Sequence, residues 1–162
     1  QHIVSLAAAA PELIWQPSDV DPSRLKSIKI WINEKKRDNV EPPIMLDATE
    51  TGWSKVNNQY DLIFVSNLLH LVSREDAEIL ITEISSALAP DGMAILYGPF
   101  KRQGELSSQG DIDFHQSIIE ADPALGYKND ADILDLFAQR GLMHKQTENM
   151  PANNLSFVFQ KK

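Results

Sequence analysis

The segment Tyr60–Ser66, with the sequence YDLIFVS, constrains the fold most strongly, because both of its faces are apolar. A strand of this kind is typical of the interior of a parallel sheet, where both sides are covered. Other short apolar runs alternate along the chain with helical patterns. This alternation predicts an α/β protein with a mostly parallel sheet.

Five further runs have the composition of strands. They are residues 13–16, 43–47, 93–98, 142–147 and 155–160. The connection between the last two is too short for a helical crossover, so we expect these strands to pair antiparallel. The polar stretch 101–113 is expected to be a loop or an insertion.

Helices are expected where caps and apolar spacing agree. Residues 2–10 are helical in composition and end before Pro11. Asp21-Pro22 is typical of a helix start, with a capping residue followed by proline at the first helical position. Ser73 with Asp76 three residues later predicts a capping box. A last helix is expected to begin at residue 129 or 130 and to end at Gly141.

Length and charge limit the classes of partner. A chain of 162 residues suits a single domain over residues 1–162. The net charge of −8 repels phosphate backbones, so no nucleic-acid partner is expected. No apolar run approaches the roughly 20 residues of a membrane helix, so we expect no membrane association. The absence of cysteine fits a reducing compartment, and we expect a cytoplasmic location.

The sequence lacks several motifs of other enzyme classes. It contains no G-x-G-x-x-G, no Walker loop, no H-E-x-x-H and no G-x-S-x-G. The histidines also lack the spacing of metal ligands, and no metal is expected; they are His2, His70, His115 and His144.

Acidic residues follow the first two expected strands, where open α/β sheets bind ligands. Asp19 is suited to accept hydrogen bonds from the two hydroxyls of a ribose. Asp47 is suited to accept from the exocyclic amine of an adenine, with the Ala48 amide donating to a ring nitrogen. The alternative for each carboxylate is a turn residue that binds its own backbone.

Polar and aromatic residues follow the next two expected strands. Asn67 and His70 interrupt the apolar run FVSNLLHLV and either line a pocket or tie loops together. Tyr97 and Phe100 either line the substrate side or belong to the core.

Six segments carry a resemblance to a known family. They are WQPSDVDP (15–22), NVEPPIMLDAT (39–49), SNLLH (66–70), LYGPF (96–100), DFHQSIIEADPALGYKN (113–129) and MPANNLSFVF (150–159). Together they make the chain resemble the class I S-adenosylmethionine-dependent methyltransferases. Within this class the chain is most similar to the uncharacterised methyltransferase-like-26 proteins and their bacterial relatives.

The resemblance implies a Rossmann-like, doubly wound sheet in the strand order 3-2-1-4-5-7-6, with strand 7 antiparallel. It implies S-adenosylmethionine as cofactor, with Asp19 at the ribose, Asp47 at the adenine and Asn67 beside the methionine part. The family's first strand and its glycine-rich loop are expected to precede Gln1. Without that strand, a gap is expected between the strands at residues 13–16 and 60–66. Either a separate segment or another copy in a homo-oligomer fills this gap, or the two strands close on each other and deform the cofactor site.

These observations favour a methyltransferase that acts on a small-molecule or protein acceptor. His70 and Tyr97 are the candidate catalytic groups, and Phe100, Asn153 and Asn154 are candidates for binding the acceptor. The alternative for the two asparagines is a turn between the last strands. Two other functions stay open. The second hypothesis is a non-catalytic binding or scaffold protein with the same fold, and the third is a nicotinamide-dependent oxidoreductase.

Overall fold

The computed structural model describes residues 2–57 and 59–162, which form two compact units, Gln1–Ala48 and Thr49–Lys162. The first unit contains α1 (His2–Ala9), β1 (Ser18–Asp19), α2 (Pro22–Lys35) and β2 (Ile44–Met45). The second contains η1 (Trp53–Lys55), β3 (Tyr60–Ser66), η2 (Leu69–Leu71), α3 (Arg74–Ala87), β4 (Leu88–Pro99), α4 (Gln109–Ala121), α5 (Asp130–Gln139), β5 (Leu142–Asn149), η3 (Pro151–Asn153) and β6 (Asn154–Lys161). No helix among the described residues is both long and apolar enough to cross a membrane.

The first unit pairs β1 and β2 in parallel, with Ser18 opposite Ile44. The strand expected at residues 13–16 is wrong in position. Trp15 makes only an isolated bridge with Val40, and the regular strand begins at Ser18. Pro17 has no N–H group, so it interrupts the hydrogen-bonded ladder between the bridge and the strand. Asp19 is therefore the last residue of the strand rather than a residue beyond it.

The start of α2 confirms the expected cap. Asp21 has an extended backbone, and its side-chain oxygen accepts a hydrogen bond from the Ser23 N–H at 2.8 Å. Pro22 takes the first helical position, where its missing N–H costs nothing. The helix ends at Lys35, and Lys36 follows it in the left-handed region with φ 48°.

The second unit is built on a four-stranded mixed sheet in the order β3-β4-β6-β5. β3 and β4 are parallel, and β6 is antiparallel to both of its neighbours. This order confirms the second half of the expected arrangement, and the fold is a Rossmann-like α/β fold. The described residues form two sheets, of two and four strands, rather than one sheet. The strand expected before Gln1 stays a prediction.

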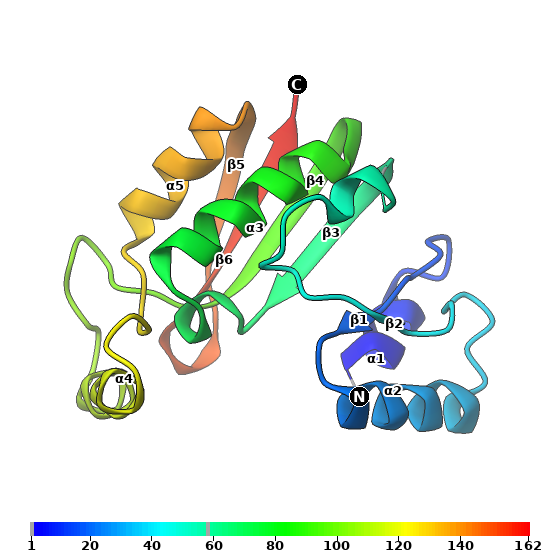
Figure 1. Ribbon diagram of the computed structural model, residues 1–162, viewed down its shortest axis with the longest axis horizontal. Helices are drawn as coiled ribbons and strands as arrows, with labels where there is room; N and C mark the ends of the chain where they lie inside the picture. Colours follow the sequence, from blue (N-terminus) through cyan, green and yellow to red (C-terminus); the bar gives the residue numbers. More distant parts are fainter. Residues whose placement is uncertain (1, 58) are drawn as a thin grey trace. The chain divides into compact units, whose positions relative to one another are not determined.

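Helices α3 and α5 lie on one face of this sheet (Figure 1). The apolar stripe of α3 is buried as expected, with Leu80, Ile81 and Ile84 at most 2% exposed. Phe137 of α5 stacks on Phe159 of β6, with ring centroids 3.8 Å apart. Full burial of one such side chain contributes about 1.5–3 kcal/mol, so this layer supplies much of the stability of the unit.

Helix α4 corrects the expectation of a loop over residues 101–113, because the helix already begins at Gln109. Ser108 is its cap, and the Ser108 hydroxyl accepts a hydrogen bond from the Asp111 N–H at 3.2 Å. α4 lies beside the end of the sheet at which β3 and β4 end (Figure 1). The helix α5, by contrast, follows its prediction, with Asn129 as cap and Gly141 at φ +79° after its end.

The capping box of α3 gives a first testable prediction. The Ser73 hydroxyl accepts from the Asp76 N–H at 3.0 Å, and the Asp76 carboxylate accepts from the Ser73 N–H at 3.3 Å. Ser73→Ala should lower the free energy of unfolding by about 1 kcal/mol in urea titrations. Ser86→Ala, within the same helix, is the control and should change it far less; equal effects would contradict the capping role.

Candidate functional site

The parallel pairing of β3 with β4 brings their carboxyl ends together. Asn67 directly follows β3, and its N–H donates to the Tyr97 carbonyl at 2.8 Å. Asn67 is exposed and lies in the left-handed region with φ 53°. This end of the sheet is where open α/β sheets bind their ligands. The residues around this end of the sheet form the candidate site.

Strained backbone gathers at the same end. Ala152 and Asn153 have φ 55° and 58°, and they directly precede β6, whose Asn154 lies opposite Pro99 of β4. Non-glycine residues in this region cost of order 1–3 kcal/mol each and often occur at functional sites. The surrounding contacts must therefore hold this turn in place.

The buried carboxylate of Asp111 supplies such contacts. Asp111 is 8% exposed and accepts three side-chain hydrogen bonds. The donors are Ser108 Oγ at 2.8 Å, Asn153 Nδ2 at 3.0 Å and Tyr127 Oη at 3.4 Å. Burial, the Asp111 charge and this hydrogen bond together raise the pKa of Tyr127 to about 12. Tyr127 is therefore protonated at neutral pH, and Asp111 joins α4 to the strained turn.

His70 lies in η2, three residues beyond Asn67, and its side chain is mostly buried at 6% exposure. Its ring packs beside Phe114 and Tyr127, at centroid distances of 5.8 and 6.1 Å. Burial, followed by the charge of Lys128, lowers the pKa of His70 below its ordinary value of 6.5. The imidazole is therefore neutral at pH 7 and able to accept a proton.

The nitrogens of the His70 ring remain open to a ligand. Among the described residues, no hydrogen bond joins these nitrogens to another group. The side-chain nitrogen and oxygen atoms that are fully buried there without a partner are Arg37 Nε and Arg102 Nε, so the His70 nitrogens are not fully buried. The His70 nitrogens therefore keep contact with solvent. The neighbouring Phe114 ring is 48% exposed and presents an apolar surface beside them.

A second histidine holds the loop that follows α4. His115 Nδ1 accepts a hydrogen bond from the Tyr127 N–H at 3.0 Å, so its neutral form carries the proton on Nε2. Gly126 packs against this ring at φ +116°, and a Cβ there would lie 2.7 Å from His115 Cε1. Lys128 Nζ donates to the Val72 and Gly126 carbonyls, at 2.7 and 3.0 Å. These contacts fix the loop against η2.

The residues expected to bind a nucleoside lie in the first unit. Asp19 Oδ1 accepts from the Asp21 N–H at 2.9 Å, and its Oδ2 lies 3.8 Å from the Arg24 guanidinium. Asp19 thus stabilises the turn that it belongs to. Its half-exposed carboxylate keeps further lone pairs that can accept hydrogen bonds. Asp47 and Ala48 follow β2, and Asp47 is exposed. The cofactor roles of these residues stay predictions.

The residues expected to bind the acceptor are divided between surface and core. Phe100 is 3% exposed and packs edge-on against Phe157 at 5.0 Å, which favours its alternative role in the core. Tyr97 is half-buried and bonded to Asn154, while Asn153 is exposed. Tyr97 is therefore better placed than Phe100 to contact a ligand.

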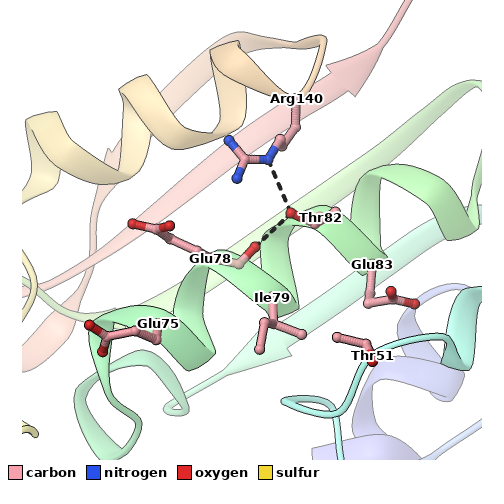
Figure 2. A pocket seen from close by; sticks show the side chains of 7 residues that line it. All are labelled: Thr51, Glu75, Glu78, Ile79, Thr82, Glu83 and Arg140. Carbon is pink, nitrogen blue, oxygen red and sulfur yellow. Dashed lines mark hydrogen bonds between the residues drawn. The ribbon is translucent and has the colours of Figure 1, made fainter.

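A hollow lies on α3 (Figure 2). It has a volume of about 350 Å³ and is lined by Thr51, Glu75, Glu78, Ile79, Thr82, Glu83 and Arg140. Arg140 Nε donates to Thr82 Oγ1 at 3.0 Å, and Thr82 Oγ1 donates to the Glu78 carbonyl at 2.7 Å. None of the catalytic, cofactor-binding or acceptor-binding residues predicted from the sequence lines this hollow. Across the described parts of the chain, no group of three or more His, Asp or Glu side chains is placed to hold a metal ion.

Sequence reasoning missed Asp111, His115, Tyr127 and Lys128 as parts of the site. All four lie in the segment 101–129, in which no helix was expected. Ser108 with Asp111 three residues later was the available signal, because it matches a helix cap.

Comparison with solved structures places this fold among the methyltransferases. An O-methyltransferase family protein from Burkholderia thailandensis has a TM-score of 0.84 and 13% identity, over 99% of this chain and 47% of that one. A putative O-methyltransferase from Nostoc punctiforme has a TM-score of 0.81 and 21% identity, over 98% and 47%. A structure described as PigF with SAH has a TM-score of 0.81 and 14% identity, over 99% and 46%.

The fold is thus the class I methyltransferase fold, and at these identities the likeness concerns the fold alone. The chain spans about half the length of these solved structures. Residues 1–161 match the model of one family, so the chain belongs to the family described as "Protein of unknown function (DUF938)".

The buried His70 and the half-buried His115 predict a pH dependence. Burial lowers the pKa of His115 as well, with further lowering by Lys101 and Lys128. Both rings should titrate below 6.5 in NMR spectra of the folded protein and near 6.5 in urea. The unfolded chain then binds protons first, so stability should fall as the pH falls below 6.5. Folded-state titration of either ring at or above 6.5 would contradict this environment.

The contacts of Asp111 predict a loss of stability on neutralisation. Asp111→Asn should lower the free energy of unfolding by about 1–3 kcal/mol. The new amide N–H group would face hydrogen-bond donors that now bind a carboxylate oxygen, so at least one of these hydrogen bonds would be lost. The control is Asp113→Asn on the exposed side of α4, where the carboxylate accepts a hydrogen bond from Gln109 Nε2 at 2.8 Å. Equal effects of both substitutions in urea titrations would contradict the role given to Asp111.

Proposed function

We propose that the protein is an S-adenosylmethionine-dependent methyltransferase whose acceptor is a small molecule or a protein group. The observation that carries the proposal is His70, a mostly buried imidazole with accessible nitrogens beside the carboxyl end of β3. Its lowered pKa keeps it neutral at pH 7. The methyltransferase fold and the resemblance to the methyltransferase-like-26 proteins support the same class of reaction.

The residues present fit the expected cofactor. Asp19 keeps lone pairs for ribose hydroxyls, and Asp47 and Ala48 are assigned to the adenine. In the second unit we assign Asn67 to the methionine part, because its left-handed backbone presents an exposed amide after β3. When bound, the cofactor supplies a methyl group on a sulfonium, a reactive electrophile.

The protein's own groups position the acceptor and manage its proton. His70 would accept the proton that the nucleophilic group of the acceptor must lose, a role worth roughly 10²–10⁴ in rate. Phe114 offers an apolar surface for the acceptor, and Asn153 and Asn154 are assigned to orient it. A cytoplasmic location and the absence of a nucleic-acid partner belong to the proposal as well.

Calorimetry with S-adenosylmethionine and S-adenosylhomocysteine tests the proposal. Asp19→Asn should weaken binding of both by about tenfold or more, because a charged hydrogen-bond acceptor to the ribose is lost. Asp38→Asn, an exposed aspartate of the same unit, is the control and should bind normally. Failure of the wild-type protein to bind either compound, or displacement by NAD, would contradict the proposal.

His70→Gln separates binding from catalysis. This variant should bind S-adenosylhomocysteine normally but lose about 10²-fold or more in methyl transfer to a proton-bearing acceptor. The control is His144→Gln on β5, where the histidine is exposed. Cofactor binding without transfer to any acceptor would instead support the non-catalytic alternative.

A further inference from the structure

Tyr97 and Asn154 lie on the same side of the sheet, at the carboxyl end of β4. Tyr97 is opposite Ser156, and Asn154 is two residues before Ser156 along β6, so both side chains share a face. The opposite face is buried under α3 and α5, with Leu96 at 2% and Phe157 at 1% exposure. Tyr97 is half-exposed and therefore reachable by a ligand.

The contacts of the Asn154 amide fix the direction of its hydrogen bond to Tyr97. Asn154 Nδ2 lies 3.2 Å from the Pro151 carbonyl and 3.1 Å from Tyr97 Oη. A carbonyl oxygen only accepts, so the amide nitrogen must face Pro151. One N–H of this nitrogen donates to Pro151, and the other donates to Tyr97.

The Tyr97 oxygen therefore accepts, and the hydrogen of its hydroxyl is left to donate. No group among the described residues accepts it. We infer that Tyr97 donates a hydrogen bond to a proton-free oxygen, a carbonyl or carboxylate, of the ligand at this end of the sheet. Asn154 is a positioning residue that keeps Tyr97 in the donor role. Tyr97 is then a binding group rather than a catalytic base.

The inference deepens the proposed function and rests on it only for the identity of one ligand. The oxygen belongs either to the amino-acid carboxylate of the cofactor or to a carboxylate-bearing acceptor. Two pairs of probes separate these sources. S-adenosylhomocysteine carries the carboxylate that 5′-methylthioadenosine lacks, and benzoate carries one that benzyl alcohol lacks.

Three substitutions distinguish the hydrogen-bond direction from general damage. Tyr97→Phe removes the donor. Asn154→Asp keeps the shape of the side chain but replaces its N–H donor with an oxygen acceptor. The Tyr97 hydroxyl then donates its hydrogen bond to the new carboxylate oxygen instead of to the ligand. Asn154→Ala loses the same contact to Pro151 but leaves the Tyr97 proton available. Tyr60→Phe, at the opposite end of the sheet, is the control for loss of a hydroxyl.

We expect Tyr97→Phe and Asn154→Asp to weaken binding of at least one carboxylate probe by about tenfold or more, and the double variant to lose no more than either. Asn154→Ala should weaken this binding less than Asn154→Asp does, because the Tyr97 hydroxyl keeps its hydrogen for the ligand. Tyr60→Phe should stay within about threefold of the wild type, and the probes without a carboxylate should bind Tyr97→Phe as they bind the wild type. NMR titrations give the affinities, and amide spectra confirm folding.

The inference is overturned if neither carboxylate probe binds the wild type, or if both bind Tyr97→Phe normally. It is also overturned if Asn154→Ala is as damaging as Asn154→Asp. Binding of benzoate without S-adenosylhomocysteine would sink the proposed cofactor and leave the role of Tyr97 standing.

Discussion

The parallel pairing of β3 with β4 is the constraint on which the candidate site depends. Leu62 to Ser66 lie opposite Met93 to Tyr97, and the ladder continues through the Asn67 N–H to the Tyr97 carbonyl. Parallel strands end at the same edge of a sheet, so the residues after both strands are brought together. Because β6 runs antiparallel to β4, it begins at this edge and adds Asn154.

The polar groups at this edge are held by buried contacts rather than by regular structure. Asp111 joins α4, the loop after it and the turn before β6 through three side-chain donors. These bonds offset the cost of the left-handed backbone at Ala152 and Asn153. Rigid support of this kind is what a site needs in order to hold His70 and Tyr97 in fixed orientations.

Local patterns made much of this fold predictable from the sequence, because caps and apolar periodicity act within a few residues. Tyr60–Ser66 formed the expected strand, and Ser73 formed the expected capping box. The strand expected at residues 13–16 was displaced because Pro17 interrupts pairing. α4 was missed because its cap stands in a polar stretch. The contact of Tyr127 with Asp111 joins residues far apart in the chain, and no local pattern reports the direction of the bond between Asn154 and Tyr97.

The central claim is that ligands bind at the carboxyl end of the sheet in the second unit. Amide NMR spectra recorded during titration with S-adenosylhomocysteine test it most directly. We expect the largest shifts within this unit at Asn67, Gly98 and Asn154, with little change at Gly92, farther from the carboxyl end of β4. Shifts concentrated on the α3 hollow, at Glu78, Thr82 and Arg140, would contradict it.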